Sequence, residues 1–362
     1  MDTPTLPRVP ATAPTPQAIR TAAPNPNHWY AVARSGEVGD RHPHSVTFWQ
    51  QAIVLYRDRQ GTVQALEDRC PHRHVKLSDG QVVGDNLECA YHGWQFNAAG
   101  HCAAVPYLTE RQKLPTCRLH RYPVREQDGF IWLFPGSTDQ AAQREPLGLP
   151  EWEHLNYIAT VSVIDCPGHF SFLIENLMDM YHGHLHDNYQ AWASAKLEHL
   201  EASDTRVEAL YEAQSYYRID KIWSISQLFF PALRRLHPEP LWVRYLYPHW
   251  VSTLGEDFKI CCLFCPVDAT HTRAYLIHFT SLQAFWRLHK LPVPFRRWLK
   301  NSLFGSAQGL LDGLVRQDVA MIAQEQQSFL DHPERRSYEL NRAIASVQRL
   351  ICQQAGIAGT NL

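Results

Sequence analysis

The sequence of 362 residues predicts an α+β protein, with a small all-β module followed by a larger domain that mixes helices and strands. Three observations predict this class. Between residues 28 and 134 the apolar residues form short runs bounded by Gly, Pro and Asp, which is typical of strands joined by turns. Beyond residue 150, two long helical patterns flank a series of strand-like runs. The chain is also about twice the usual domain length, which favours two domains.

The first 27 residues are predicted to be a disordered tail. They are rich in proline, alanine and threonine, and they contain too little apolar surface to offset the entropy lost on ordering. Strands are expected at residues 46–48, 53–56 and 130–134, and residues 135–150 have the composition of a linker. The predicted small domain therefore spans residues 28–140.

Residues 141–362 are predicted to form the larger domain. Helical periodicity covers residues 169–186 and 304–329. Strand-like runs occupy residues 207–219, 241–247, 258–264 and 274–282. Strands and helices of this kind must pack on one another to bury their apolar sides, which gives the α+β class.

Charge and composition exclude several classes of protein. Lys plus Arg number 34 and Asp plus Glu number 36, so the net charge of -2 argues against nucleic acid as the partner. No apolar run approaches the ~18 residues that a transmembrane helix needs. Nine cysteines are an odd number, which argues against a disulfide scaffold and for a reducing compartment. A cytoplasmic protein is expected.

Two motifs in the small domain each combine a cysteine with a histidine. Cys70-Pro71-His72 precedes Cys89-Ala90-Tyr91-His92, and two such loops can present two thiolates and two imidazoles to one centre. Thiolates stabilise ferric iron, and imidazoles on a second iron raise the reduction potential of a cluster. Zinc accepts the same ligands, but zinc motifs usually pair like with like. Gly93 is expected to form a turn or to let the backbone pass close to the centre, and Trp94 to pack in the core rather than beside a ligand.

A second group of polar residues falls on the first predicted helix of the larger domain. At ~100° per residue, Asp179, His182 and His186 share a narrow stripe with Glu175, while His184 points the opposite way. The flanking residues are too apolar for this stripe to face solvent. Two imidazoles and a carboxylate on one side are the ligands of non-haem Fe(II) sites that activate O₂. The stripe therefore predicts an iron site.

Both motifs resemble those of the Rieske non-haem iron oxygenases. The pattern C-x-H followed by C-x-x-H-G-W at residues 70–94 is similar to their [2Fe–2S] motif, and D-x-x-H-x-x-x-H at residues 179–186 is similar to their catalytic signature. The resemblance implies a small antiparallel-β Rieske domain and a helix-grip (START-like) catalytic domain with a central antiparallel sheet. The implied ligands of the Rieske cluster are Cys70, His72, Cys89 and His92.

The same resemblance assigns roles in the catalytic domain. It implies that His182 and His186 bind a mononuclear Fe(II), although many members of the family have one more residue between the two histidines. The third ligand would be a carboxylate of the C-terminal helix, and Asp318 fits its motif better than the second candidate, Asp312. Asp179 would not bind iron. By resemblance, it would carry electrons from the Rieske histidine of a neighbouring subunit to His182 in a homotrimer.

The implied function is the terminal oxygenase of a Rieske system. Electrons would pass from the cluster to the mononuclear iron, which activates O₂ to hydroxylate, demethylate or otherwise oxidise a hydrophobic organic substrate. The layout resembles O-demethylases and the pheophorbide and chlorophyllide oxygenases. Because the sequence contains no G-x-G-x-x-G, electrons are expected from an external reductase or ferredoxin. The alternatives are a Rieske electron-transfer protein with a non-catalytic second domain and a zinc-dependent binding module.

One charged segment remains outside this interpretation. Residues 269–311 contain no acidic residue, and aromatic and basic residues alternate between 285 and 304. Such a segment can dock an acidic ferredoxin, contact an anionic membrane surface, or be a solvated basic face near the substrate entrance. Membrane association through residues 285–304 is therefore one expectation.

Overall fold

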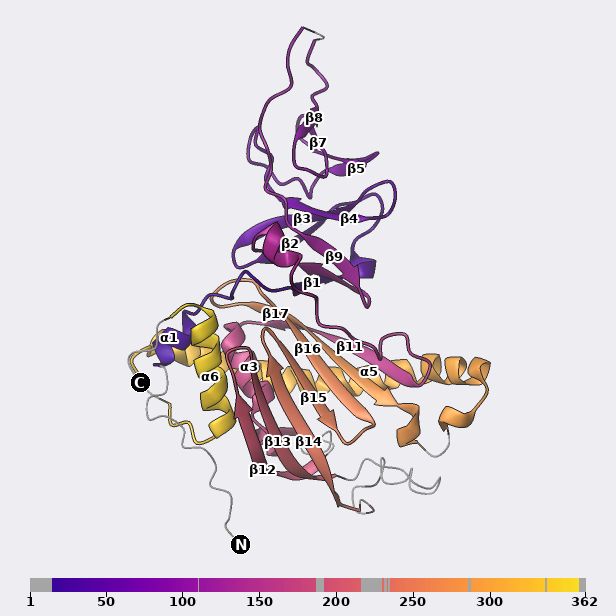
Figure 1. Cartoon of the computed structure of the whole chain (residues 1–362), viewed down its shortest axis with the longest axis vertical. Coiled ribbons are helices and arrows are strands. Elements are labelled where there is room, and N and C mark those ends of the chain that lie inside the picture. The colour runs from indigo at the N-terminus through magenta and orange to yellow at the C-terminus, as the bar shows by residue number, and fades with distance from the viewer. Residues whose placement is uncertain are drawn as a thin grey trace. The chain divides into compact units, whose positions relative to one another are not determined.

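The computed structural model describes residues 15–109, 111–186, 192–215, 230, 233, 235–285, 288–335 and 337–357. The chain divides into two compact units (Figure 1). The small unit spans Asn25–Leu149, and the large unit combines the residues before Asn25 with those from Pro150 onward. The predicted boundary at residue 140 thus lies within the small unit, because helix α2 (Thr138–Ala141) and the segment after it continue that unit.

The small unit is built from three antiparallel sheets. The first has the strand order β1-β10-β9, the second β2-β3-β4 and the third β5-β6-β7-β8. The second Cys/His motif forms the loop between β6 and β7 of the third sheet. The strands are β1 (Tyr30–Arg34), β2 (His44–Phe48), β3 (Gln51–Arg57), β4 (Val63–Glu67), β5 (Gln81–Val83), β6 (Asn86–Glu88), β7 (Gln95–Phe96), β8 (Cys102–Ala104), β9 (Val124–Gln127) and β10 (Phe130–Leu133). Cys70 and Cys89 lie in one apolar core with Val54, Leu66 and Phe96.

The large unit is organised by one seven-stranded antiparallel sheet with the order β11-β17-β16-β15-β14-β13-β12. Its strands are β11 (Tyr157–Cys166), β12 (Trp192–Ala202), β13 (Arg206–Ser215), β14 (His237–Leu246), β15 (His249–Leu254), β16 (Phe258–Pro266) and β17 (Thr272–Ser281). Alternate residues of β11 are buried, as expected for a strand with one side against a core. This architecture confirms the predicted α+β class with a central antiparallel sheet.

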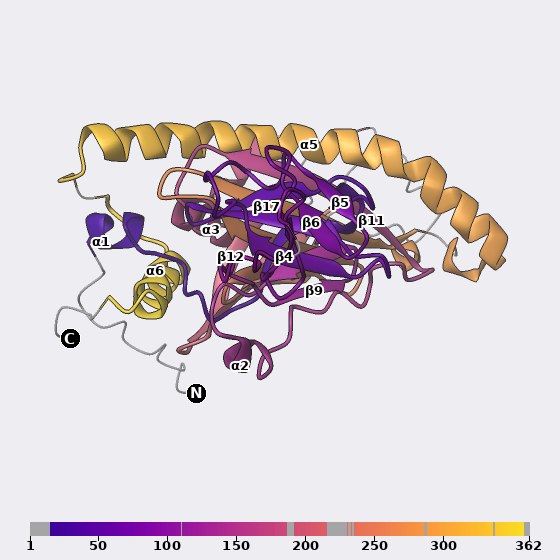
Figure 2. The ribbon, with the colours of Figure 1, turned by 90° about the horizontal axis from the view of Figure 1, so that it is seen from above.

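Three helices pack on this sheet or beside it. They are α3 (Phe170–Met178), α5 (Val293–Asp331) and α6 (Arg342–Gln354). Figure 2 shows α5 running along the sheet beside β11. Polar contacts fix this position, because Gln308 of α5 accepts a hydrogen bond from the Val161 amide at 3.1 Å and Asp312 accepts one from the Ser162 hydroxyl at 2.6 Å. None of the described helices is both long enough and apolar enough to span a membrane.

The predicted helix over residues 169–186 is wrong in its second half. Helix α3 ends at Met178, Asp179 has an extended backbone, and His182–His186 form the 3₁₀ helix η2. The Asp179 carboxylate accepts hydrogen bonds from the Tyr181 amide and the Asn341 side chain, both at 3.0 Å. Side chains of this kind compete with the helical hydrogen bonds of the backbone and end the helix. The side chain of His184 lies outside the described part of the structure.

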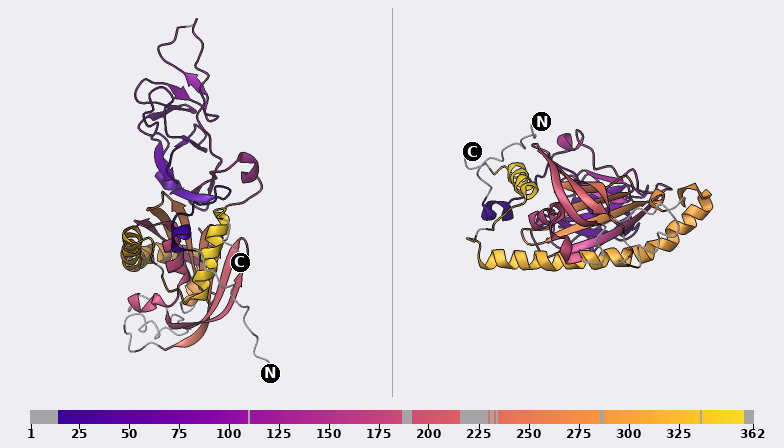
Figure 3. Two further views of the ribbon diagram at one scale, coloured as in Figure 1. Left: turned by 90° about the vertical axis from the view of Figure 1, so that its left-hand side faces the viewer. Right: turned by 90° about the horizontal axis from the view of Figure 1, so that it is seen from below.

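The prediction of a disordered tail is wrong for residues 15–27, while residues 1–14 lie outside the described residues. Pro16–Arg20 form helix α1, with Thr15 capping its first turn. Figure 3 shows α1 and α6 at the same end of the large unit. Arg20 forms a two-pronged ion pair with Glu175 of α3, at 2.6 and 2.8 Å. Composition could not predict that this segment is ordered, because Glu175, the partner of Arg20, lies 155 residues away in the sequence.

Candidate metal centres

The two Cys/His loops of the small unit have the same backbone hydrogen bonds. In the first loop the Cys70 amide donates to the carbonyl of Val75, and the His74 amide donates to the carbonyl of Cys70. In the second, Cys89 and Trp94 form the equivalent pair, and Gly93 donates to Cys89. His74 and Gly93, at matching positions, both have left-handed backbones, with φ of 60° and 67°. Two similar turns thus present one cysteine and one histidine each.

The two cysteine side chains are more deeply buried than the two histidine side chains. Cys70 and Cys89 are buried, with 1% and 2% of their surface exposed, whereas His72 and His92 are half-buried with ring centroids 4.5 Å apart. Burial, and then contact with Cys89, raises the pKa of the Cys70 thiol. The buried Nδ1 of His72 has no hydrogen-bond partner among the described residues. Adjacent buried thiols and an unpaired imidazole nitrogen fit a [2Fe–2S] cluster, since the metal takes up the charge of the thiolates and the nitrogen lone pair.

Trp94 and Gly93, which follow His92, have structural roles that the sequence did not define. Trp94 packs against the core, as expected, but it also stacks on His72, with ring centroids 4.7 Å apart and planes at 7°, so the expectation that it does not lie beside a ligand is wrong. Its indole donates to the Tyr107 hydroxyl at 2.6 Å, which holds the ring in place. At Gly93 a Cβ atom would lie 2.8 Å from Pro106, and its positive φ also favours glycine.

The second centre lies where η2 meets α5 in the large unit. Among the described residues, His182, His186 and Asp318 form a group whose ligand atoms all lie within 4.8 Å of one another. Nε2 of His186 is 3.2 Å and Nε2 of His182 is 3.6 Å from Oδ1 of Asp318. His186 and Asp318 are buried and His182 is half-buried. Two imidazoles and one carboxylate around one point fit Fe(II) with positions left for other ligands.

The two imidazoles have different electrostatic surroundings. Burial lowers the pKa of His182, and the nearby charge of Asp318 only partly opposes this effect. Burial also acts against protonation of His186, but its hydrogen bonds and charge interaction with Asp318 outweigh burial and raise its pKa. A carboxylate and two imidazoles that share one buried position form a site with a net affinity for a cation.

Two neighbours orient these side chains, and sequence reasoning missed both. The Gln317 side-chain oxygen accepts a hydrogen bond from Nδ1 of His186 at 3.0 Å, which leaves Nε2 of that ring as the metal-binding atom. The Asn176 amide donates to Oδ1 of Asp318 at 3.3 Å. Both residues stand within the motifs, but only the meeting of α3, η2 and α5 shows which side chain each one contacts.

The other two acids of the predicted site lie apart from this group. Asp179 accepts hydrogen bonds from Tyr181 and Asn341, as described above, and is half-buried at the end of α3. Asp312 accepts from Ser162 and, at 2.8 Å, from the Gln308 side chain. The structure therefore brings Asp318, and not Asp312, to the two histidines.

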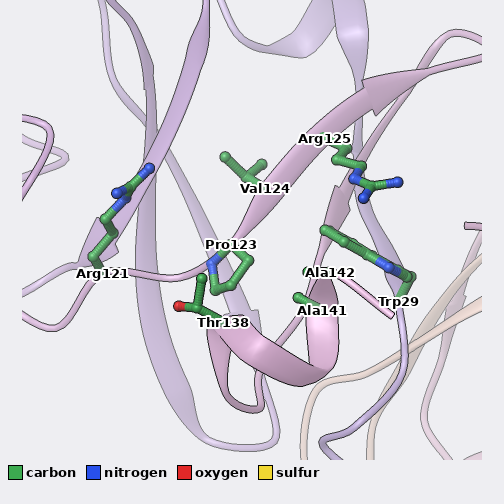
Figure 4. Close-up of a pocket in the computed structure, with 8 residues that line it drawn as sticks. All are labelled: Trp29, Arg121, Pro123, Val124, Arg125, Thr138, Ala141 and Ala142. Carbon is green, nitrogen blue, oxygen red and sulfur yellow. The ribbon is translucent and has the colours of Figure 1, made fainter. Parts of the chain in front are cut away.

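A pocket in the small unit lies outside both centres. It has a volume of about 240 Å³, which is below the ~300–1,000 Å³ typical of ligand pockets. Figure 4 shows its lining, which consists of Trp29, Arg121, Pro123, Val124, Arg125, Thr138, Ala141 and Ala142. Arg125 pairs with Glu145 and covers the Trp29 ring at 4.9 Å. None of the predicted site residues contributes to it.

Known proteins are similar to this chain in sequence. Residues 28–123 match the Rieske [2Fe-2S] domain. The chain is 32% identical over 364 residues to 4beta-methylsterol monooxygenase of Methylococcus capsulatus, an alignment that covers 96% of this chain and 91% of that enzyme. It is 32% identical over 161 residues to the oxygenase component of dicamba O-demethylase from Stenotrophomonas maltophilia, covering 43% of this chain and 45% of that protein.

The fold agrees with these relatives. Dicamba monooxygenase bound to 3,6-dichlorosalicylic acid superimposes with a TM-score of 0.73 at 20% identity, covering 93% of this chain and 99% of that chain. A Rieske domain, a second domain of the oxygenase fold and a relative matched over nearly its whole length all lead to one assignment. The chain belongs to the Rieske non-haem iron oxygenases, as a terminal oxygenase with a [2Fe–2S] cluster and a mononuclear iron.

Proposed function

We propose that Cys70, His72, Cys89 and His92 hold the [2Fe–2S] cluster and that His182, His186 and Asp318 hold the mononuclear Fe(II). The observation that carries the second assignment is the convergence of these three side chains within 4.8 Å. When bound, the two iron centres supply electrons and activate O₂, so that oxygen is inserted into an organic substrate. External reductase or ferredoxin components deliver the electrons.

The side chains around the second centre prepare it for this chemistry. Gln317 fixes the tautomer of His186 through Nδ1, and Asn176 orients the carboxylate of Asp318. Phe172, Leu173 and Ile174 of α3 are buried, as is Met178 just before Asp179. This apolar support holds the ligand-bearing segment in place and keeps bulk water away from it.

We assign Asp179 to electron transfer between subunits of a homotrimer. Its carboxylate is fixed by Tyr181 and Asn341, so its position is defined without a metal. It stands three residues before His182 in the sequence and stays outside the group of three metal-binding side chains. A fixed carboxylate beside a ligand can hold an imidazole in one orientation through a hydrogen bond.

Two substitutions separate these roles. Asp318→Asn should lose mononuclear iron, because a carboxamide is a poorer ligand for Fe(II) than a carboxylate. Asp179→Asn should keep both centres loaded but slow re-oxidation of the reduced cluster in the presence of substrate and O₂. Asp312→Asn serves as the matched control for iron content, and it should retain iron. Iron loss in Asp179→Asn with retention in Asp318→Asn would show that the two roles are exchanged.

For the substrate we propose an apolar polycyclic compound of the sterol type. The 4beta-methylsterol monooxygenase is aligned over 91% of its length, far more than the dicamba enzyme at 45%. The sheet also presents buried apolar residues such as Trp250, Val243 and Leu254 on one side. Incubation of the reduced protein with a C4-methylated sterol or with dicamba, followed by mass spectrometry, should yield an oxygenated sterol. Oxidation of dicamba alone would contradict this proposal.

We propose further that the start of α5 contacts an anionic membrane surface, where such substrates dissolve. Phe295 and Trp298 are 47% and 59% exposed, and their rings lie 5.3 Å apart. Lys290 and Arg297 are exposed in the same segment. Exposed aromatic residues among cations are typical of proteins that bind the membrane interface. Besides the two proposed cluster ligands, seven cysteines are outside any disulfide, which supports a reducing cytoplasmic compartment.

Sedimentation with lipid vesicles tests the membrane contact. The protein should bind vesicles that contain phosphatidylglycerol and release them at high salt, while neutral phosphatidylcholine vesicles bind weakly. Trp298→Glu should abolish binding. Tyr338→Glu is the matched control, because Tyr338 is a 97% exposed aromatic residue outside this segment. Equal binding of the two variants would contradict a specific contact through α5.

A further inference from the structure

One side of the seven-stranded sheet faces α5, and the strand register identifies its residues. Ser162 lies on this side because its hydroxyl donates to Asp312 of α5. Thr160 is two residues away on the same strand and therefore shares this side. Its cross-strand partner is His278, whose next partner is Ile260. Residues directly opposite one another in antiparallel strands point to the same side, so these three form a row across β11, β17 and β16.

Several buried polar atoms on this side have no hydrogen-bond partner within the part of the chain that the structure describes. Oγ1 of Thr160, Nδ1 of His278 and Nε1 of Trp250 are buried and have no hydrogen-bond partner among the described residues. Trp250 lies on this side because it pairs with Cys262, which pairs with Leu276 opposite Ser162. Buried polar groups normally have partners, so a group of unpaired ones on one surface needs an explanation.

His278 also keeps accessible surface where a central strand would normally have none. Strand β17 lies between β11 and β16, yet His278 and Ile260 are only half-buried. Thr160, beside them, is 2% exposed and Trp250 is 3% exposed. The row thus combines buried polar atoms with one partly exposed apolar side chain, Ile260, and a mostly apolar ligand with a polar group would match both.

The charges on this side favour an uncharged ligand. Burial lowers the pKa of His278 to about 4, so the ring is neutral near pH 7. The strand register places Lys259, Arg244 and Arg273 on the opposite side of the sheet. Within the described strands, no Lys or Arg therefore joins this side, while Asp312 adds a negative charge to it. An anion would lose its hydration without finding a cation.

This row and the mononuclear centre both contact helix α5. Asp312, which contacts the sheet beside Thr160, and Asp318, which contacts the two histidines, are six residues apart on α5. That separation corresponds to about 9 Å along the helix. A polycyclic molecule of sterol size is long enough to reach both places.

We propose that Thr160 and His278 bind a neutral hydroxyl or keto group of the substrate, so that the enzyme takes uncharged alcohols or ketones rather than carboxylates or sulfonates. This inference rests on the proposed oxygenase function and names the substrate class of that same site. A threonine hydroxyl and a neutral imidazole each offer a donor and an acceptor, which suits a group that is itself a donor or an acceptor.

Equilibrium dialysis of the metal-loaded protein tests this inference without turnover. The probes are the steroid alcohol androstanol, its parent hydrocarbon androstane, and androstanol sulfate. Androstanol should bind about tenfold more tightly than androstane, and the sulfate at least about tenfold more weakly than the alcohol. His278→Leu and Thr160→Val should each reduce the preference for the alcohol to about twofold or less, and His278→Gln should restore part of it.

A matched pair of threonines controls for structural damage. Thr160→Val should not lower the melting temperature, because the hydroxyl that it removes is unpaired. Thr272→Val removes a hydroxyl on the same side that donates to the Gly168 carbonyl at 2.9 Å, so it should lower the melting temperature and leave the preference unchanged.

The experiment distinguishes failure of this inference from failure of the proposed oxygenase function. The inference is overturned if the sulfate binds as tightly as the alcohol, if no probe binds, or if the preference survives both His278→Leu and Thr160→Val. Iron content and oxygenase activity are measured separately on the same samples. A protein that prefers the alcohol but lacks the second iron or any oxygenase activity would refute the proposed function and leave the binding inference standing.

Discussion

Removal of the Arg20 side chain should destabilise the large unit, because it breaks a buried ion pair. The guanidinium bonds both oxygens of Glu175, donates to the Ser171 hydroxyl at 2.5 Å and lies 3.5 Å above the Phe172 ring. The two charged side chains are only 9% and 13% exposed. Arg20→Met leaves the Glu175 carboxylate buried without a cation, which costs about 3–5 kcal/mol.

A loss of this size is measurable by calorimetry. For a unit of this length, each kcal/mol shifts the melting temperature by roughly 2–4 °C, so the expected drop is on the order of 6–20 °C. Arg206→Met is the matched control. Arg206 is 48% exposed and lies 3.4 Å from Glu201 and 3.8 Å from Glu208. Glu208 keeps Arg244 at 3.7 Å, so the loss of this surface arginine costs less than about 1 kcal/mol.

The double substitution Arg20→Met with Glu175→Leu distinguishes a buried charge from lost packing. Without the carboxylate no unpaired charge remains, so the double variant should regain most of the melting temperature. The reasoning is refuted if Arg20→Met melts within about 2 °C of Arg206→Met, or if the double variant is no more stable than Arg20→Met. Since α3 also carries Asn176, Arg20→Met should in addition lower the mononuclear iron content.

Four further predictions follow from the two centres and their surroundings. His72→Ala should remove the visible absorption of the cluster while the mononuclear site still binds iron, and an unchanged spectrum would refute the ligand assignment. Gly93→Ala should lower cluster content, because a Cβ meets Pro106 at 2.8 Å and the backbone is left-handed, so normal loading would contradict this account. Gln317→Leu should weaken mononuclear iron about 10–100-fold by chelator competition, whereas Gln317→Glu should retain much of it. Burial, with the charge of Arg20, lowers the pKa of His169 to about 3. As the pH falls, the unfolded state therefore binds a proton at this histidine before the folded state does. The contribution of His169 to the free energy of unfolding is complete above about pH 6.5 and drops by up to ~1.4 kcal/mol per pH unit towards pH 3. Denaturation of His169→Gln as a function of pH should show a smaller slope.

The fold class was predictable because the local patterns in the sequence reflect it. The strands predicted at residues 46–48, 53–56 and 258–264 lie in observed strands, and the one at 274–282 overlaps β17, which ends at Ser281. Helix α6 was not predicted, since its burial depends on α3 and β13, which lie far away in the sequence. The end of α3 was missed for the same reason, because the Asn341 side chain that bonds Asp179 belongs to a segment 162 residues away.

The candidate sites were more predictable than the elements that carry them. The Cys/His spacing depends on local turns, and both loops do form the same turn. For the second centre, the expected group of His182, His186 and Asp318 comes together, although the continuous helix behind that expectation is absent. The 3₁₀ helix η2 presents the two histidines instead. Sequence patterns indicate which residue types meet, but only the tertiary structure shows that Gln317 and Asn176 hold them.

The measurement that most directly tests the central claim is the ratio of iron to acid-labile sulfide in the purified protein and in Asp318→Asn. A Rieske cluster and a separate mononuclear site in one chain predict about three irons and about two sulfides per chain. In Asp318→Asn, iron should fall to about two with sulfide and the cluster spectrum unchanged. A ratio of about two irons to two sulfides in the fully loaded protein, unaltered by Asp318→Asn, would contradict the account and indicate an electron-transfer protein.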